Sequence, residues 1–495
     1  RAGDTVSRLG GDEFVLLFAG VGDIHECDHA VSRVLTALAA PFAISGNSIV
    51  ISASIGVTLF PVDGSDADAL LRHADQAMYT AKQAGRNRFH LFDPESDRRA
   101  RARRDEISRI RQGLSEHEFV LHYQPKVNMR EGRVLGAEAL IRWQHPEKGL
   151  LAPAQFLPAI EGSEVDILVG EWVLEAGLTQ LEQWQAAGLE MVLSVNISGT
   201  HLQSPTFVEN LGKLLAAHPL IAPESLELEI LETAALDDMA MAAEIFVACR
   251  SLGVSFALDD FGTGYSSLTY FRRLPAETLK IDQSFVRDML DDPDDMAIVE
   301  GVIGLTKAFG RTVIAEGVET PEHGMILLQL GCDQAQGYGI ARPMPGADFP
   351  AWSKSFVPNE LWSSIASFKW AREDLPMLVA EIDHKRWMQK LDAFLADNAD
   401  LSPSPMQNYR TCHLGRWYYG PHSQRYAEIE SFAEIESIHT RIHELGNECI
   451  ELKKIGDHKL LATRLTELHK ASDDLTEHIQ LIQAEVLLST QMTKR

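Results

Sequence analysis

The stretch from SLELEIL (residues 225–231) to VSFALDD (residues 254–260) decides the fold of the central part of the chain, because it sets two short β-rich runs around a helical segment. The same alternation continues throughout residues 113–352. The other β-rich runs are VLHYQPKV (120–127), MVLSVNIS (191–198), ETLKID (277–282), TVIAEGV (312–318) and DQAQGYG (333–339). A strand followed by a helix, repeated many times, predicts a (β/α) barrel.

The pattern changes on either side of this region. Residues 1–94 mix short apolar strands with amphipathic helices, and residues 371–495 carry long helical periodicity with almost no strand pattern. Residues 95–112 are charged and helix-prone, and residues 353–370 form a second connector. At roughly 100–200 residues per domain, 495 residues predict about three domains. We therefore expect a multidomain protein with a partial α/β domain, a barrel and an all-α bundle.

Composition and charge exclude several classes of protein. Hydrophobic residues make up 45% of the chain and charged residues 23%, which is typical of a globular rather than a disordered or fibrous protein. The chain has 45 Lys and Arg residues against 71 Asp and Glu residues, a net charge of −26, which disfavours nucleic-acid polymers as partners. Its five cysteines are scattered and odd in number, which fits a reducing cytoplasm and not a disulfide framework.

The sequence shows no signal for a membrane or for export. No apolar run reaches the ~18 residues that a bilayer-spanning helix needs, and no signal peptide is recognisable. Because the chain opens at Arg1 within a few residues of a motif, we expect it to be the C-terminal part of a longer protein. We expect a cytoplasmic location and no membrane contact for this segment, with room for a sensor or membrane anchor upstream.

Acidic and amide residues recur at the ends of the predicted barrel strands. The polar strand-end residues are Glu138, Asn196, Glu229, Asp259, Asp260, Lys280, Glu316, Glu319 and Gln336. Because the C-terminal ends of parallel strands converge on one face of a barrel, we expect these side chains to meet around one cavity. A lone glutamate at a strand end is more often a helix cap or part of a surface ion pair. Because the whole set recurs at successive strand ends, a shared site explains it better than a series of such unrelated roles.

Such a cluster of carboxylates predicts a metal site. Close carboxylates repel one another unless cations neutralise them, and oxygen ligands suit Mg²⁺ or Mn²⁺. Asp259 and Asp260 can supply a bridging and a terminal ligand to two metals about 3.5–4 Å apart, an arrangement used for in-line displacement at phosphoesters. Near two cations the pKa of Lys280 should fall, so this lysine is a candidate to orient or deprotonate an attacking water.

These residues also carry a resemblance to a known family. Residues 113–352 resemble the EAL-domain family of cyclic-di-GMP phosphodiesterases, and the shared motifs stand in the family order. The motifs are YQPKV, EALIRW, SVNIS, ELEILE, DDFGTGYSSL, LKID, AEGVE and QGYGIARPMP. The resemblance implies a (β/α)8 TIM-like barrel that binds cyclic-di-GMP and hydrolyses it to linear pGpG by two-metal catalysis.

The resemblance also implies a role for each site residue. The implied ligands of two Mg²⁺ or Mn²⁺ ions are Glu138, Asn196, Glu229, Asp259, Asp260 and Glu316. The implied catalytic set is Lys280, which would contact the attacking water, with Glu138, Asp259, Asp260 and Glu319. The residues that match contacts to the dinucleotide are Gln124, Arg142 and Gln336. Glu232 matches the residue that holds the DDFGTGYSSL loop, which the family places near its dimer interface.

Because every implied metal position is filled, an active phosphodiesterase, expected to be a homodimer, is the leading hypothesis. A cyclic-di-GMP receptor that binds without cutting is a second hypothesis. A bifunctional cyclase and phosphodiesterase is a third, and it applies to the full-length parent.

RLGGDEFVLLF at residues 8–18 predicts a β-hairpin with Asp12 and Glu13 exposed at its tip. The four residues Gly-Gly-Asp-Glu alone fit a plain hairpin with polar turn residues. With SIGVTLFP and LLRHADQAMYTAKQAGRNRF, however, they resemble the GGDEF family of diguanylate cyclases. The resemblance implies a GTP site lined by Gly10, Gly11, Asp12 and Glu13, with Lys82 and Arg86 on the phosphates.

The front part of the GGDEF pattern is absent from this chain, so we expect no cyclase activity from it. GTP is then expected to bind only in the full-length protein, as a cyclase substrate or as an allosteric effector. Arg1 and Asp4 stand at the offset where that family keeps an inhibitory RxxD site.

The C-terminal region combines histidines with a cysteine. His439 and His443 face the same side of a helix, and two such imidazoles with a third histidine and a thiolate complete a tetrahedral zinc set. An HxxxH pair alone is usually a surface feature. TCHLGRWYYG and its flanking spacings, however, resemble the chemoreceptor zinc-binding family. The resemblance implies one Zn²⁺ held by His384, Cys412, His439 and His443, in a bundle that regulates the enzyme as a zinc or redox sensor.

Overall fold

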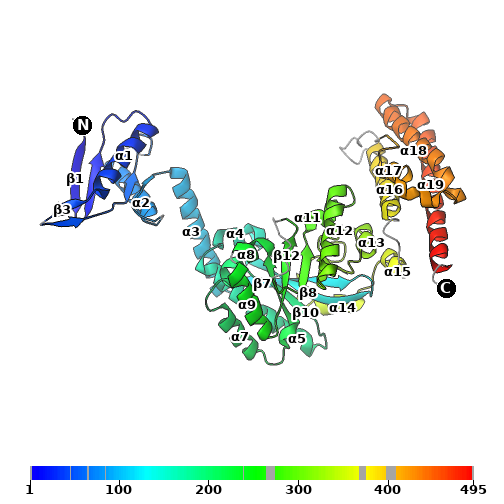
Figure 1. Cartoon of the computed structure of the whole chain (residues 1–495), viewed down its shortest axis with the longest axis horizontal. Helices are drawn as coiled ribbons and strands as arrows, with labels where there is room; N and C mark the ends of the chain where they lie inside the picture. The colour runs from blue at the N-terminus through cyan, green and yellow to red at the C-terminus, as the bar shows by residue number, and fades with distance from the viewer. Residues whose placement is uncertain are drawn as a thin grey trace. The chain divides into compact units, whose positions relative to one another are not determined.

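The computed structural model describes residues 3–44, 46–63, 66–83, 85–237, 239–263, 274–366, 375–396 and 408–492. The chain divides into two compact units, Arg1–Arg109 and Ile110–Arg495 (Figure 1). Within the described ranges, no helix combines the length and the apolar character that crossing a bilayer requires.

The first unit consists of short strand pairs and amphipathic helices. Strands β1 (Thr5–Gly10) and β2 (Glu13–Leu17) pair in antiparallel fashion, which confirms the predicted hairpin. Its turn lies at Gly11 and Asp12, one residue later than the predicted Gly-Gly turn, because Gly10 still pairs with Glu13. Helix α2 (Ala67–Gln83) packs on β5 (Ile55–Val57), where a Cβ on Gly56 would lie 1.8 Å from the carbonyl oxygen of Ala74. The remaining elements are α1 (Ile24–Ala39), β3 (Phe42–Ile44), β4 (Asn47–Ile49), β6 (Phe89–Leu91) and α3 (Pro94–Ser115), the last of which continues into the second unit.

The second unit contains a closed barrel of eight strands within the described residues, and this confirms the predicted barrel. The ring order is β7, β15, β14, β13, β12, β11, β10 and β8, with β8 pairing back to β7. The strands are β7 (Phe119–Asn128), β8 (Arg133–His145), β10 (Val192–Asn196), β11 (Leu226–Leu231), β12 (Ser255–Phe261), β13 (Thr278–Ile281), β14 (Thr312–Ala315) and β15 (Gln334–Ala335).

The barrel departs from the all-parallel arrangement at one strand. β7 runs antiparallel to both of its neighbours, β8 and β15, whereas the other seven strands are parallel to one another. The physical reason is the connection, because only a short turn at residues 129–132 joins β7 to β8, and a parallel pair needs a long crossover.

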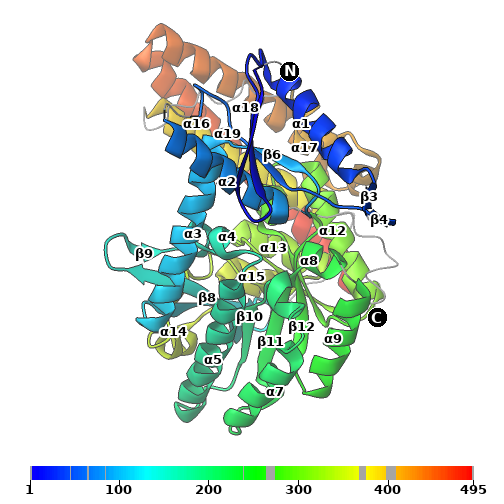
Figure 2. The same cartoon turned by 90° about the vertical axis from the view of Figure 1, so that its left-hand side faces the viewer.

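The alternation along each strand explains which side chains enter the barrel. In β11 the side chains of Leu226, Leu228 and Ile230 are fully buried, and Glu227 and Glu229 alternate with them. Helix α5 (Glu164–Ala186) contacts β10, and α9 (Met239–Ser251) contacts β12, on the outside of the ring (Figure 2). The apolar residues therefore pack against the helices, and the polar ones gather inside.

Shorter elements complete the barrel region. They are β9 (Gly149–Leu151), α4 (Leu157–Ile160), α6 (Gly199–Leu202), α7 (Phe207–Ala217), α8 (Glu232–Asp237), α11 (Gln283–Asp288), α12 (Pro293–Ala308), α13 (Pro321–Leu330), β16 (Met344–Pro345), α14 (Phe349–Ser355) and α15 (Glu360–Ala366), with 3₁₀ turns at Pro153–Gln155 and Pro223–Ser225.

The described part of the C-terminal region is entirely without strands, which confirms the predicted helical bundle. Its helices are α16 (Leu375–Leu395), α17 (His413–Tyr418), α18 (Glu430–Ile455) and α19 (His458–Met492), with a 3₁₀ turn at Pro421–Tyr426. Gly456, with φ of +80°, ends α18 in the left-handed conformation, and α19 then packs along α18. Trp417 is buried in the bundle core and Trp387 packs against that core.

Candidate active site

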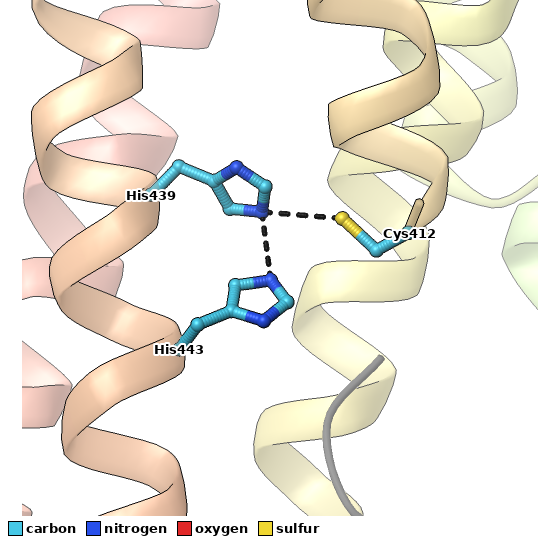
Figure 3. Close-up of side chains that lie close together, drawn as sticks. All are labelled: Cys412, His439 and His443. Atoms are coloured by element: carbon cyan, nitrogen blue, oxygen red, sulfur yellow. Dashed lines mark hydrogen bonds between the residues drawn. The ribbon is translucent and has the colours of Figure 1, made fainter. Parts of the chain in front are cut away.

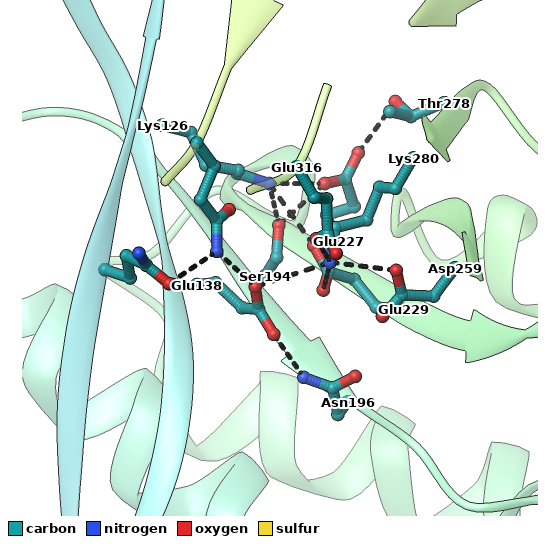
Figure 4. Close-up of polar contacts among 12 residues, drawn as sticks. Lys126, Glu138, Ser194, Asn196, Glu227, Glu229, Asp259, Thr278, Lys280 and Glu316 are labelled. Atoms are coloured by element: carbon teal, nitrogen blue, oxygen red, sulfur yellow. Dashed lines mark hydrogen bonds and ion pairs between the residues drawn. The ribbon is translucent and has the colours of Figure 1, made fainter. Parts of the chain in front are cut away.

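Lys280 lies at the centre of the polar residues inside the barrel. It comes from β13 and is fully buried. Its Nζ atom lies 2.6 Å from an oxygen of Glu229, 2.6 Å from Glu316, 3.2 Å from Asp259 and 3.3 Å from Glu138 (Figure 4). Four carboxylates from four different strands therefore converge on one ammonium group, as the sequence predicts for a barrel. Glu229, Asp259 and Glu316 lie at or near the ends of their strands, whereas Glu138 lies in the middle of β8.

Amide side chains hold Glu138 in a fixed orientation. Its two oxygens accept hydrogen bonds of 2.6 Å, one from Nδ2 of Asn196 and the other from Nε2 of Gln336. Gln336 also donates to Oε1 of Gln124 at 3.0 Å, and Gln124 donates to the carbonyl of Ala341. The Oε1 atom of Gln336 is buried without a hydrogen-bond partner among the described residues. The predicted substrate-binding glutamines thus adjoin the carboxylate cluster.

The Asp259–Asp260 pair stands at the end of β12. Oδ1 of Asp259 accepts a hydrogen bond from the backbone N–H of Asp260 at 3.0 Å. Asp260 has a φ of +53°, a conformation that is uncommon for residues other than glycine and that clusters at functional sites. Two residues further on, the N–H of Gly262 donates to the buried carboxylate of Glu232 at 3.1 Å. Residues 264–273 of the predicted loop lie outside the described residues.

The acidic side chains form two groups that fit divalent cations. Glu138, Glu229 and Asp259 make one group and Asp259, Asp260 and Glu316 make the other, and within each group the ligand atoms lie within 4.8 Å of one another. Asp259 belongs to both groups, as expected for a bridging ligand. The sequence assigns the same carboxylates to the two metals. Their role as ligands remains a prediction.

The electrostatics of the cluster explain why a cation would bind there. Burial and repulsion from Glu138 raise the pKa of Glu229 to about 8, and burial and Asp259 raise the pKa of Asp260 to about 7. Burial alone would lower the pKa of Lys280, but Asp259 and the other three carboxylates raise it well above its usual value. The predicted fall in the pKa of Lys280 depends on bound cations and stays a prediction. The four carboxylates carry more negative charge than the single ammonium group of Lys280 can compensate, and divalent ions would neutralise the remainder.

Two other predicted residues lie further from the cluster. Arg142 is half-buried on β8, donates to the carbonyl of Ile141 at 2.9 Å, and has a pKa that burial lowers. Glu319 is exposed, and neither carboxylate group found among the described residues includes it. The proposed catalytic role of Glu319 is therefore still untested.

Sequence reasoning missed a second buried lysine and its partners. Lys126 of β7 donates to Oε1 of Glu227 at 2.7 Å and to the hydroxyl of Ser194, and Thr278 donates to Oε2 of Glu227 at 2.9 Å. Although burial alone would raise it, the pKa of Glu227 is lowered to about 2 by Lys126 and the two hydroxyls. The two-residue periodicity of a strand could have identified Lys126 and Glu227, because Lys126 follows Gln124 by two residues and Glu227 precedes Glu229 by two, so each pair lies on one face of its strand.

Three of the four predicted zinc ligands meet in the helical bundle. Nε2 of His439 lies 3.3 Å from Sγ of Cys412 and 3.0 Å from Nε2 of His443 (Figure 3). Cys412 caps α17, where the N–H of Gly415 donates to its sulfur, and a Cβ on Gly415 would lie 1.9 Å from the carbonyl of Tyr409. A thiol and two imidazole nitrogens are ligands that zinc prefers, so the cluster fits that ion.

The fourth predicted zinc ligand, His384, lies nearby but makes another contact. It is buried on α16, and its Nε2 atom is 2.9 Å from the hydroxyl of Ser472 on α19. Burial and the neighbouring His443 lower the pKa of His384 to about 4, and burial and His443 lower the pKa of His439 to about 3. The histidines are therefore neutral, which is the form that binds a metal.

The predicted nucleotide site of the first unit is exposed. Gly10, Gly11, Asp12 and Glu13 form the tip of the β1–β2 hairpin, and the carbonyl of Gly11 accepts from Arg8. Lys82 on α2 and Arg86 after it are exposed as well. In the predicted inhibitory pair, Arg1 lies outside the described residues. Asp4 accepts a hydrogen bond from the N–H of Ala19 at 3.4 Å.

Family models match three parts of the chain. They are the diguanylate cyclase GGDEF domain at residues 1–88, the EAL domain at 107–343 and the chemoreceptor zinc-binding domain at 384–450. A closed barrel with adjoining carboxylate groups at its strand ends defines the structural class. The chain belongs to the EAL domain family, and it combines that domain with part of a GGDEF domain and with a chemoreceptor zinc-binding domain.

Curated relatives match about 70% of this chain. The bifunctional diguanylate cyclase/cyclic di-GMP phosphodiesterase MucR of Pseudomonas aeruginosa is 39% identical over 70% of this chain and 50% of its own length. The cyclic di-GMP phosphodiesterase PdeR of Escherichia coli K12 is 36% identical over 71% of this chain and 53% of its own length. The chain thus spans about half the length of these relatives. A solved c-di-GMP complex of the PaMucR phosphodiesterase is 39% identical, with a TM-score of 0.48, and covers 50% of this chain and 99% of its own.

Proposed function

We propose that residues 113–352 hydrolyse cyclic-di-GMP to linear pGpG with two Mg²⁺ or Mn²⁺ ions. The observation that carries this proposal is the pair of carboxylate groups that share Asp259 at the strand ends of the barrel. Membership of the EAL domain family supports it, as does the activity named for the relatives MucR and PdeR.

Each residue of the cluster has a distinct role in this proposal. The metals would be held by Glu138, Asn196, Glu229, Asp259, Asp260 and Glu316. When bound, they would polarise the phosphodiester and lower the pKa of a water molecule. Lys280, which faces four of these carboxylates, would orient the attacking water through its ammonium group. Gln124, Gln336 and Arg142 would position the dinucleotide, and Glu232 would hold the chain at Gly262.

We propose that the C-terminal bundle regulates this activity through one Zn²⁺. The convergence of Cys412 with His439 and His443 supports a zinc site, and a zinc-bound thiolate is open to oxidation. The measurement is hydrolysis before and after zinc is chelated and restored, and equal rates in both states would contradict regulation by zinc. Dimerisation of the barrel and GTP binding by the GGDEF part of the full-length protein are further proposals from family membership.

The test of the main proposal is hydrolysis of cyclic-di-GMP by the purified chain with Mg²⁺ or Mn²⁺. Glu138→Ala removes a residue that belongs to one carboxylate group and contacts Lys280, so we expect turnover to fall by at least about 100-fold. The matched control is Glu209→Gln, which changes an exposed carboxylate on α7 and should leave the rate unchanged.

The same experiment separates the enzyme from a receptor. A receptor would bind cyclic-di-GMP, measured by calorimetry, without any turnover in the unmodified chain. Absence of hydrolysis by metal-loaded protein therefore refutes the phosphodiesterase, and retained binding in that case would establish the receptor.

A further inference from the structure

A buried charge network lies beside the carboxylate cluster without being part of either metal group. Lys126 is 3% exposed, and its Nζ atom donates to Glu227 at 2.7 Å and to the hydroxyl of Ser194 (Figure 4). Ser194 itself donates to the same oxygen of Glu227 at 2.6 Å, and Thr278 donates to the other oxygen at 2.9 Å. The network draws on four strands, β7, β10, β11 and β13, so it joins strands on different sides of the barrel.

Glu229 connects this network to the predicted metals. Its Oε2 atom is 2.6 Å from Lys280, whereas its Oε1 atom lies 3.5 Å from Lys126 and has no hydrogen-bond partner among the described residues. The carboxylate of Glu229 is fully buried and therefore stands between two ammonium groups. A charge on each side fixes the plane of the carboxylate, which would otherwise be free to turn about its terminal torsion.

The partner of Lys126 explains why this lysine need not compete with a metal. The carboxylate of Glu227 compensates its positive charge at hydrogen-bond distance, so the pair as a whole is close to neutral. Residues that hold a ligand in this way typically change metal affinity by about 10–100-fold when they are altered. Replacing a buried ion pair by groups of similar volume, in contrast, often leaves stability unchanged.

We propose that Lys126 and Glu227 are positioning residues that orient the carboxylate of Glu229 for divalent-cation binding. This inference takes one point from the proposed function, which is that Glu229 is a metal ligand. It does not depend on turnover, because cation binding is measurable without substrate.

The experiment compares Mn²⁺ binding by calorimetry in the full chain and in the double variant Lys126→Met/Glu227→Gln. Both replacements keep the side-chain volume, and glutamine keeps one acceptor oxygen for the two hydroxyls, Ser194 and Thr278, that donate to Glu227. The single variant Glu229→Gln defines the background, and binding that survives it is subtracted. We expect the double variant to bind Mn²⁺ about 10–100-fold more weakly. The Mn²⁺ concentration for half-maximal hydrolysis should rise by the same factor, with KM for cyclic-di-GMP unchanged at saturating Mn²⁺.

The matched control is Thr278→Val, which removes one hydrogen bond to Glu227 and leaves the facing pair of Lys126 and Glu229 in place. This control tests whether any disturbance of the network is enough to weaken Mn²⁺ binding. The Mn²⁺ affinity of Thr278→Val should stay within about threefold of that of the unmodified chain. Thermal unfolding checks that each variant is folded. If the double variant does not fold, Ser194→Ala, which removes only the hydroxyl partner of Lys126 and Glu227, must weaken Mn²⁺ binding by more than the control does.

Unchanged or tighter Mn²⁺ binding by a folded double variant would overturn the proposal, because Lys126 would then be inert or a competing cation. An equal loss in Thr278→Val would overturn it as well, since general loosening of the barrel would explain both. If the unmodified chain binds Mn²⁺ and the variants respond as expected, yet none hydrolyses cyclic-di-GMP, the proposed function fails and this inference stands.

Discussion

The polar cluster in the barrel consists of charged side chains, whereas the histidines of the cluster in the helical bundle are neutral. In the barrel, four carboxylates surround Lys280, and the pKa values of Glu229 and Asp260 are raised by burial and by their acidic neighbours. In the bundle, burial lowers the pKa values of His384 and His439 to about 4 and about 3, so these groups are neutral. The carboxylates of the barrel cluster need a positive charge to compensate them, and the neutral histidines of the bundle cluster do not.

This difference teaches how each cluster can be assembled before a metal arrives. Buried carboxylates repel one another, so the barrel supplies an internal cation in Lys280. Neutral imidazoles carry no such penalty, and burial keeps them in the form that binds zinc. The following predictions test that contrast, from the largest expected effect to the smallest.

Lys280→Met should break the barrel cluster and leave the bundle intact. Loss of the ammonium removes the water-orienting group and leaves four carboxylates without their cation, so hydrolysis should fall by at least about 100-fold. Removing one partner from a buried charged network also costs roughly 3–5 kcal/mol, which should lower the unfolding temperature in chelator. Lys213→Met, on the exposed face of α7, is the matched control. Unchanged stability and rate in Lys280→Met would contradict the assigned role.

The double variant Cys412→Ala/His439→Ala should break the bundle cluster in turn. The unmodified chain should contain about one zinc per chain by metal analysis, and the variant should contain none, because two of its tetrahedral ligands are gone. Cys449→Ala is the control, since Cys449 is also buried on α18 but lies outside the cluster. Equal zinc content in both variants would show that the metal is bound elsewhere.

Acid should destabilise the zinc-free bundle through its histidines. Their folded pKa values, about 4 for His384 and about 3 for His439, lie below the unfolded value of about 6.5. The stability they contribute is therefore fully present above about pH 6.5 and is lost as the pH falls toward the folded values. At pH 5 the loss should be about 2 kcal/mol for each histidine.

Hydrogen exchange of α16 and α18 in chelated protein measures this local stability between pH 7 and pH 5. Zinc-loaded protein is the control and should lose less protection over the same interval, because bound metal keeps the histidines unprotonated. An opening free energy that does not change with pH in the chelated protein would contradict the buried, neutral state of these side chains.

Local patterns predicted most of the elements correctly, and they failed where the connection of strands mattered. The alternation in SLELEIL and the hairpin signal around Gly11 are local, and they appear in β11 and in the β1–β2 hairpin, whose turn lies one residue later than predicted. The antiparallel course of β7 was missed, because strand runs by themselves do not say which neighbours they pair with. Lys126 and Glu227 were not predicted as site residues, although each lies two residues from one that was, Gln124 and Glu229. A single strand does not show which of its interior positions contact one another.

The sequence by itself determined the residue types at the strand ends and the HxxxH spacing that sets His439 and His443 on one face of α18. These depend on periods of two and 3.6 residues, which are properties of a single segment. The tertiary structure alone decided that Lys280 and Glu138, 142 positions apart, lie in contact, and that His384 turns its Nε2 atom to Ser472. Such contacts depend on closure of the barrel and on the packing of helices, which bring distant segments together and leave no periodic signal in the chain.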